Sequence, residues 1–273
     1  MKKIFLFISL LALLILSCQK SIPKKGIVVI SPELAEIIVS IAGDGQIIGV
    51  AEECDYPDIL QSKEKVGNFG QISLEKIIKL NPEYVITSSL EQESIAKELQ
   101  KIGIKTVSLY PKSIKDMLNI ITELGKITKT EKQAEILRNN ISQQIDSLKT
   151  FKPDTEKSVL IEIYNDPLMS VSDASFVGEL LQIAGGKNVF PVLERDYCRV
   201  KNEEVIKANP DVIIITYPGM TKEMVKSRKG WQKINAVKYN RIYTTEEVNP
   251  DFILRAIPRS IEGIKQLRKA IYE

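Results

Sequence analysis

A chain of 273 residues with 44% apolar and 27% charged residues has an ordinary globular composition and enough length for two medium domains. Its formal net charge is +3, of which Lys2 and Lys3 supply two, so the rest carries 3 − 2 = +1 and offers no basic field for nucleic acid. The sequence contains no histidine, which removes the most common general base, the most common metal ligand and every His-dependent triad.

The N-terminus has the pattern of an export signal. Two lysines precede an unbroken apolar run over 4–16, too short to span a bilayer comfortably, and Ser17 and Cys18 follow. This ending resembles a bacterial lipobox, in which the cysteine is lipidated and becomes the first residue. We therefore expect residues 1–17 to be removed, Cys18 to carry the lipid, and residues 18–26 to form a tether. The alternatives are an ordinary signal peptide with a coincidental cysteine, or a short anchor.

Residues 27–112 predict a first lobe of alternating strands and helices. The apolar run 27–30 leads into Ser31 and Pro32, a helix N-cap followed by proline at the first helical position. Such a junction places free backbone N–H groups at the carboxyl edge of a parallel sheet, where ligands of open α/β sheets bind. Further strands are expected at 47–50, 84–87 and 105–109, with helices after Ser73 and over 95–102.

One stretch of the sequence occurs twice. Glu75 to Ile86 returns 128 positions later as Glu203 to Ile214, with Glu, Ile, Lys, Asn and Pro at the same places. Each copy predicts a short amphipathic helix with an acid in its first turn, an Asn-Pro stop with the asparagine in extended backbone, and an apolar strand. A repeat of this spacing indicates two similar α/β lobes rather than one enlarged domain.

Residues 113–156 are predicted to connect the lobes through helices. A helix over 113–128 is followed by Thr130-Glu131-Lys132-Gln133, which has the form of a capping box and opens a second helix to about Thr150. At 1.5 Å per residue, the second helix is about 30 Å long and can cross a whole lobe. This length favours a rigid rod over a flexible linker.

Residues 157–273 predict the second lobe. Strands are expected at 159–163, 212–216 and 241–244, a helix from Ser175 to Gly185-Gly186, the repeated Glu203 helix, and a terminal helix from Pro258. Residues 164–173 and those around Tyr197 are expected to be loops. Trp231, the only tryptophan, is predicted to lie in the core because Ile234 and Val237 follow it.

Several motifs occur together in a recognisable order. They are Ile30-Ser31-Pro32 with Glu36, Gly49-Val50, Asp55-Tyr56-Pro57, Val66-Gly67, the two Asn-Pro repeats, Gly185 to Phe190, and Arg255 with Pro258-Arg259. The chain thereby resembles the substrate-binding lipoproteins of ABC importers for cobalamin and iron–siderophores. The resemblance implies the class III periplasmic binding protein fold, an α/β fold of two Rossmann-like lobes joined by a long rigid α-helix. It also implies a non-enzymatic monomer, lipid-anchored in the periplasm or on the outer face of the cytoplasmic membrane.

The resemblance assigns a docking role to two acidic residues. Glu75 and Glu203, one per lobe, are expected to meet arginines of the ABC permease, where charge pairs set orientation and on-rate. The alternative is that each acid only complements its own helix dipole, which contributes roughly 0.3–1 kcal/mol.

The resemblance also assigns ligand contacts. Tyr56 and Phe69 on the first lobe and Tyr197 on the second match cleft-lining positions, and aromatic faces there suit a corrin ring. Met169 and Arg255 are further ligand-contact candidates. Arg259 is instead expected to support the terminal helix, and Cys54 and Cys198 are expected to be free thiols.

Three classes of function follow. The leading one is a receptor for cobalamin or a related corrinoid, with an iron–siderophore or haem as the alternative, because Phe69 and Ser88 depart from the aromatics of a cobalamin binder. The second is an α/β enzyme acting at the cleft, which the missing histidine and the absence of a Gly-x-Ser-x-Gly elbow disfavour. The third is a scaffold lipoprotein without a ligand. No resident cofactor or metal is expected.

Overall fold

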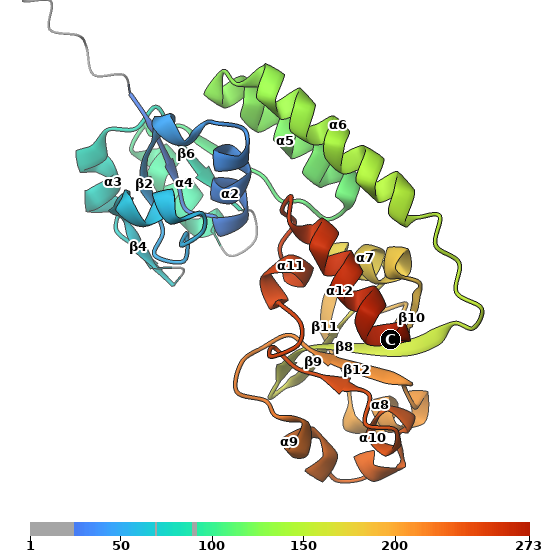
Figure 1. Ribbon diagram of the computed structural model, residues 1–273. Helices are drawn as coiled ribbons and strands as arrows, with labels where there is room; N and C mark the ends of the chain where they lie inside the picture. Colours follow the sequence, from blue (N-terminus) through green and yellow to red (C-terminus); the bar gives the residue numbers. More distant parts are fainter. Residues whose placement is uncertain (1–24, 69, 89–91) are drawn as a thin grey trace, which may run out of the picture.

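The structure, a computed structural model, describes residues 25–68, 70–88 and 92–273. It contains two α/β lobes, with a pair of long helices that runs along the first lobe and returns to the second (Figure 1). The expected signal peptide, Cys18 and Phe69 lie outside the described residues. Within the described residues, no helix is long and apolar enough to span a membrane.

The first lobe is built on a five-stranded parallel sheet in the order β3-β2-β1-β6-β7. Its strands are β1 (Ile27–Val29), β2 (Ile47–Val50), β3 (Glu64–Lys65), β6 (Tyr84–Thr87) and β7 (Thr106–Ser108). Its helices are α2 (Pro32–Ser40), α3 (Leu74–Leu80) and α4 (Glu93–Lys101), with short 3-10 turns at Asp44–Gln46 and Asp58–Ser62. A small hairpin, β4 (Gly67–Asn68) with β5 (Gln71–Ile72), stands apart from the sheet.

The start of α2 confirms the sequence prediction. The Ser31 hydroxyl accepts a hydrogen bond from the Leu34 N–H at 3.3 Å, and Pro32 occupies the first helical turn. Because β1 ends at Val29, the helix begins directly at the carboxyl edge of the sheet. This edge therefore carries the N-terminus of α2.

The second lobe has six strands in a mixed sheet. They are β8 (Lys157–Asn165), β9 (Leu168–Val171), β10 (Gly186–Asn188), β11 (Tyr197–Arg199), β12 (Val212–Ile215) and β13 (Ile242–Tyr243). β8, β10, β12 and β13 run parallel, whereas β9 and β11 are antiparallel to their neighbours. Its helices are α7 (Phe176–Ala184), α8 (Asn202–Ala208), α9 (Lys222–Ser227), α10 (Asn235–Lys238), α11 (Pro250–Leu254) and α12 (Ser260–Tyr272), with a 3-10 turn at Trp231–Lys233.

The expectation of loops at 164–173 and around Tyr197 is wrong. β8 continues to Asn165, the chain turns at Asp166-Pro167, and β9 pairs back onto β8. The Ser170 hydroxyl donates to the Ile161 carbonyl at 2.8 Å, which satisfies a polar side chain inside the hairpin. Tyr197 then lies in β11, which extends this antiparallel edge of the sheet.

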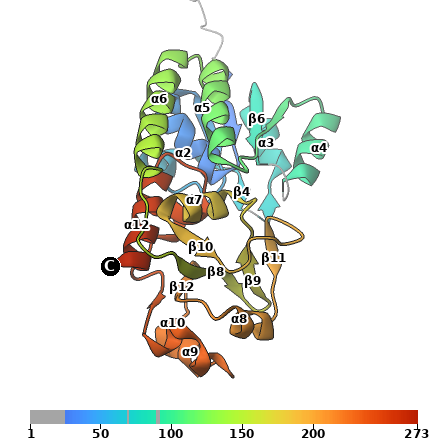
Figure 2. The ribbon, with the colours of Figure 1, turned by 90° about the vertical axis from the view of Figure 1, so that its right-hand side faces the viewer.

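The two helices predicted between the lobes are present and form a helical hairpin. α5 (Ile114–Thr128) runs along the first lobe, and α6 (Glu131–Leu148) returns beside it to the second lobe (Figures 1 and 2). The capping box predicted at Thr130 is not formed, because its hydroxyl pairs with the Thr128 hydroxyl at 2.7 Å. α6 has 18 residues, about 27 Å at 1.5 Å per residue, so it still supplies the long crossing helix.

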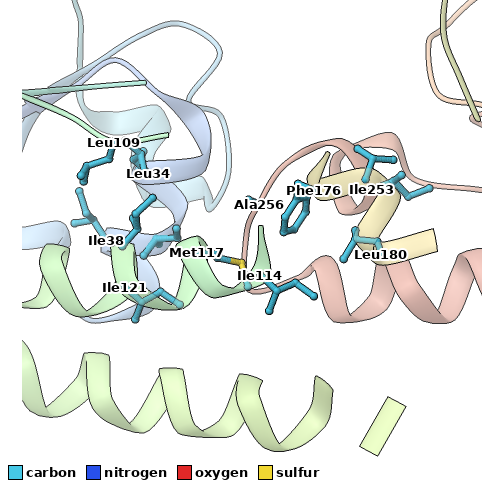
Figure 3. Packing of buried hydrophobic residues seen from close by; sticks show 14 of the residues in the cluster. Leu34, Ile38, Leu109, Ile114, Met117, Ile121, Phe176, Leu180, Ile253 and Ala256 are labelled. Carbon is cyan, nitrogen blue, oxygen red and sulfur yellow. The ribbon is translucent and has the colours of Figure 1, made fainter. Parts of the chain in front are cut away.

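One hydrophobic core continues across both lobes. Figure 3 shows Leu34, Ile38 and Leu109 of the first lobe against Met117 and Ile121 of α5, with Ile114 leading on to Phe176 and Leu180 of the second. A second cluster lies beneath α8 to α10 and contains Trp231, which is fully buried as predicted. Because the first cluster crosses the lobe boundary, apolar packing opposes a change in the spacing of the lobes.

The duplicated stretch forms α3 with β6 and α8 with β12, so the repeat is structural as well as sequential. The predicted extended conformation of its asparagines is wrong. Asn81 and Asn209 both adopt the left-handed conformation instead, which ends each helix before its proline.

Candidate functional site

A cavity of about 320 Å³ lies between the two lobes. Glu33 of α2, Tyr110 and Pro111 line it from the first-lobe side, and Ile163, Phe176, Tyr197, Leu254, Arg255 and Ala256 line it from the second. Its volume lies within the range of about 300–1,000 Å³ typical of small-molecule sites, toward the lower end. The apolar side chains thus surround a few polar groups, as is usual for a binding cleft.

The cavity lies at the carboxyl ends of strands from both sheets. Glu33 stands in the first turn of α2 directly after β1, Tyr110 follows β7, and Ile163 lies near the end of β8. Ligands of open α/β sheets bind outside the carboxyl ends of the strands. The carboxyl ends of the strands of both sheets therefore face the same cavity.

Two phenols and two charged groups give the cavity its polar chemistry. Tyr197 is held in β11, where it pairs with Val171 of β9. Burial raises the pKa of Tyr197 above its usual range, and proximity to Tyr110 and Asp196 adds to this shift. The Tyr197 phenol therefore stays neutral and can donate a hydrogen bond.

Arg255 brings positive charge to the cavity. Its Nε lies 3.3 Å from Oδ1 of Asp251, one helical turn earlier, so the neighbouring carboxylate offsets part of that charge. Glu33 supplies a carboxylate from the opposite lobe. The site thus places a negatively charged carboxylate and a positively charged guanidinium on opposite walls. This arrangement suits a ligand that carries both amide and charged groups.

Arg259 joins the two lobes beside the cavity. Its Nε donates to Oε1 of Glu36 at 2.8 Å, and its Nη2 donates to Oε2 at 2.6 Å. The guanidinium also lies 3.6 Å from the ring centroid of Tyr56 and 4.8 Å from that of Phe252. The hydrogen bond to Glu36 raises the pKa of Arg259.

The expectation that Arg259 supports the terminal helix is therefore wrong. Although the residue stands at the N-terminus of α12, its side chain reaches away from the helix to an acid 223 positions earlier. The planar guanidinium matches a carboxylate with two parallel hydrogen bonds, and Glu36 is otherwise buried in α2.

The described residues among the proposed ligand contacts divide into two groups. Tyr197 and Arg255 line the cavity together. Tyr56 is half-exposed and stacks on Arg259 without lining the cavity, whereas Met169 lies in β9 opposite Arg199 and is also outside the lining. Phe69 lies outside the described residues.

Sequence reasoning missed several lining residues. Glu33, Tyr110 and Phe176 were not singled out as ligand contacts, although the first two directly follow predicted strands. Their positions after strand ends are the signal that could have found them. Phe176 carries no such signal, because a phenylalanine in the first turn of a helix is most often core.

The two repeated acids are exposed on separate lobes. Glu75 and Glu203 each stand in the first turn of their helix, with the side chain toward solvent. Within the described part of the chain, neither acid takes part in an ion pair. Figure 1 shows α3 at the left end of the first lobe and α8 in the lower part of the second lobe.

Cys54 and Cys198, the cysteines that the structure describes, are both free thiols. Cys54 is buried, its Sγ lies 3.7 Å from the Val29 carbonyl, and burial raises its pKa to about 12. Cys198 is partly exposed in β11. No group of three or more His, Cys, Asp or Glu side chains in the described ranges could hold a metal ion.

Two α/β lobes around a cleft at their strand ends define a two-lobed solute-binding protein. The chain belongs to the periplasmic binding protein family, whose model matches residues 27–248. Members of this family are non-catalytic components of transport systems. The expected fold class and the non-enzymatic assignment are confirmed, and the chain is the substrate-binding component of an ABC importer.

Three known proteins illustrate the relationship. The chain is 32% identical to an uncharacterized ABC transporter substrate-binding lipoprotein, YvrC, of Bacillus subtilis (strain 168), over 93% of this chain and 81% of that protein. It is 26% identical to a vitamin B12-binding protein of Vibrio parahaemolyticus, over 89% and 87%. A solved structure of a possible iron-binding (periplasmic solute-binding) protein from Staphylococcus epidermidis has a TM-score of 0.80 and 29% identity, covering 90% of this chain and 98% of that one.

Proposed function

We propose that this protein captures a metal chelate in the cleft between its lobes and presents it to an ABC permease, and that the chelate is cobalamin or a related corrinoid. The observation that carries the proposal is the cavity lined from both lobes, with aromatic and apolar walls and a few polar groups. The similarity to a vitamin B12-binding protein over most of the chain supports it.

The chemistry of the cavity favours a preassembled chelate over a bare cation. The pKa of Tyr197 is raised, so its phenol does not act as an anionic ligand near neutral pH. A neutral phenol and the Arg255 guanidinium donate hydrogen bonds, and the periphery of a corrinoid carries amide carbonyls that accept them. Recognition would then use the edge of the ligand while its metal remains bound by the macrocycle.

The size of the cavity also bears on the mode of binding. At about 320 Å³ the cavity holds only part of a corrinoid. Such a ligand would bind along one edge, and the rest of it would stay exposed at the open side of the cleft. Partial exposure suits a receptor that must hand its ligand to a permease. Tyr56, half-exposed near the cavity, is available to contact the exposed part.

A ferric chelate, either a siderophore complex or haem, is the second candidate. It is favoured by the similarity to a possible iron-binding protein. Arg255 would then pair with the carboxylates of the chelate.

Docking and anchoring complete the proposal. The exposed Glu75 and Glu203 would each meet a basic group of the permease, one per lobe. Lipidation of Cys18 would hold the monomeric receptor at the outer face of the cytoplasmic membrane or in the periplasm.

The ligand class is tested by visible absorption of the protein purified from its own host. Corrinoids, haem and ferric siderophores all absorb visible light with different spectra. A bound corrinoid spectrum supports the first candidate, and a haem or ferric siderophore spectrum supports the second. A colourless protein that takes up none of the three on incubation contradicts both.

A further inference from the structure

The contact between Arg259 and Glu36 is a bidentate ion pair that connects the two lobes. Two charge-assisted hydrogen bonds of 2.8 and 2.6 Å join a guanidinium of the second lobe to a carboxylate of the first. The Glu36 side chain is 3% exposed and that of Arg259 is 22% exposed. Tyr56 covers the guanidinium from the first lobe at 3.6 Å. We call Arg259, Glu36 and Tyr56 the interlobe clamp.

The clamp lies close in sequence to the cavity lining on both sides. Glu36 follows the lining residue Glu33 by three positions in α2, and Arg259 follows the lining residue Arg255 by four. A shift of either clamp residue therefore moves a wall of the cavity. The helical hairpin joins the lobes alongside them and makes a polar contact of its own with the second lobe, where the Ile114 N–H donates to Oε2 of Glu179 at 2.7 Å.

A second ion pair of the same build provides an internal comparison. Arg228 donates to both carboxylate oxygens of Glu162 at 2.6 and 2.7 Å and lies 4.4 Å from the ring of Trp231. Glu162 is fully buried, and all three residues belong to the second lobe. This pair fixes parts of one lobe to each other and does not cross the cleft.

We propose that Arg259 is a positioning residue for the ligand site, because the clamp sets the spacing of the cavity walls and places Tyr56 at the cleft. The geometry requires a planar, two-donor group, since one face of the guanidinium stacks on Tyr56 while its edge engages both oxygens of Glu36. Lysine keeps the charge but supplies neither the bidentate edge nor the flat face. The affinity part of this proposal rests on the proposed function, whereas the lobe-spacing part does not.

The test measures the distance between the lobes in ligand-free protein. Spin labels are placed on Lys101→Cys in α4 and Lys233→Cys in the second lobe, both exposed positions, with Cys18→Ser and Cys198→Ser introduced. Cys54 stays unlabelled, because it is buried and its pKa is about 12. Pulsed electron–electron double resonance then gives the distance distribution for wild type, Arg259→Lys, Glu36→Gln and Tyr56→Leu.

The matched controls are Arg228→Lys and Glu162→Gln. We expect Arg259→Lys and Glu36→Gln to broaden the interlobe distribution about twofold, Tyr56→Leu to broaden it less, and the controls to leave it unchanged even where they lower the melting temperature as much. Circular dichroism confirms that each variant is folded. Because Tyr56→Leu leaves the ion pair in place, it tests the clamp even if loss of that pair prevents folding.

The affinity arm uses cyanocobalamin and haem as probes. For whichever probe wild type binds, Arg259→Lys is expected to weaken binding about tenfold, and Arg228→Lys to leave it within about twofold of wild type. If neither probe binds wild type, corrinoid and haem are excluded as the ligand, while the distance measurement still decides the clamp. An interlobe distribution in folded Arg259→Lys, Glu36→Gln and Tyr56→Leu that matches wild type would overturn the proposal.

Discussion

Asn81 and Asn209, 128 positions apart, end equivalent helices of the two lobes in the same backbone conformation, with φ of 47° and 49° and ψ of 55° and 60°. Each asparagine is followed by proline and then by an apolar strand. Asparagine tolerates the left-handed region better than other residues with a Cβ, which accounts for its use at both sites. The two sites differ in one contact, because the Asn209 side-chain oxygen accepts from the Asn235 N–H at 2.8 Å.

This relationship predicts different responses to the same substitution. Asn81→Ala should lower the free energy of unfolding by about 1 kcal/mol, because the Cβ of alanine disfavours the left-handed conformation. Asn81→Gly should leave the free energy of unfolding unchanged or raise it slightly. Asn209→Gly should still destabilise by about 1 kcal/mol, since it also removes the acceptor for Asn235. Urea denaturation of the three variants checks this. Equal stability of Asn81→Ala and Asn81→Gly would show that backbone strain is not the cause.

Charge reversal of the two exposed acids should separate transport from binding. The double variant Glu75→Lys and Glu203→Lys is expected to lose most ligand uptake in cells, because two like charges would then face the permease. Affinity for the ligand should stay within about twofold of wild type, since neither residue lines the cavity. A matched control reverses Glu135 and Asp146, two exposed acids of α6. Full uptake by the first variant, or equal loss in both, contradicts the docking role.

Cys54 should make the protein sensitive to alkali. In the unfolded chain its thiol has a pKa of 9.0, whereas burial in the folded protein raises this pKa to about 12. Between these values the unfolded chain releases the proton and the folded protein keeps it, so the free energy of unfolding falls as pH rises above 9. At pH 11 the loss from this residue is about 2–3 kcal/mol.

The measurement compares wild type with Cys54→Ala by urea denaturation at pH 8 and pH 11. All other groups titrate in both proteins. The difference between the two proteins in the stability lost from pH 8 to pH 11 therefore reports the contribution of the Cys54 thiol. The variant should be less stable at pH 8, because it leaves a small cavity, yet lose less stability on going to pH 11. Parallel losses in the two proteins would exclude Cys54 as the sensitive group.

The lipid anchor gives a cellular prediction. Cys18→Ser should move the protein from the membrane fraction to the soluble fraction, because the lipid chains supply the attachment. Ligand affinity should be unchanged, since residue 18 precedes both lobes. The check is fractionation followed by extraction with carbonate. Retention of the variant in the membrane would show that another segment holds the protein.

Local signals in the sequence predicted most of the fold. Ser31 with Pro32 located a helix start, the duplicated Asn-Pro stretch predicted two lobes, and the apolar setting of Trp231 predicted its burial. Each of these signals depends on neighbours within about one helical turn or on direct repetition. A local signal can fail where two hydrogen-bond partners compete for one side chain. The Thr130 hydroxyl, predicted to cap α6, bonds to the Thr128 hydroxyl instead.

The site was harder to predict than the fold, because its side chains come from segments far apart in the sequence. Tyr197 and Arg255 were found through the resemblance, but the pairing of Arg259 with Glu36 joins residues 223 positions apart, which no local pattern indicates. Met169 was assigned to a loop that proved to be a strand, and its side chain lies outside the cavity lining. Which side chains meet across a cleft is set by how two lobes pack, and that packing depends on the whole hydrophobic core.

The most direct test of the account is calorimetric titration of the lipid-free mature protein with cyanocobalamin, haem and a ferric siderophore. The account predicts that one of these binds with one-to-one stoichiometry, and that Tyr197→Ala and Arg255→Glu each weaken it at least about tenfold, while Tyr239→Ala, at an exposed tyrosine away from the cavity, does not. Binding that survives both cleft substitutions unchanged, or no binding of any of the three by wild type, would contradict it.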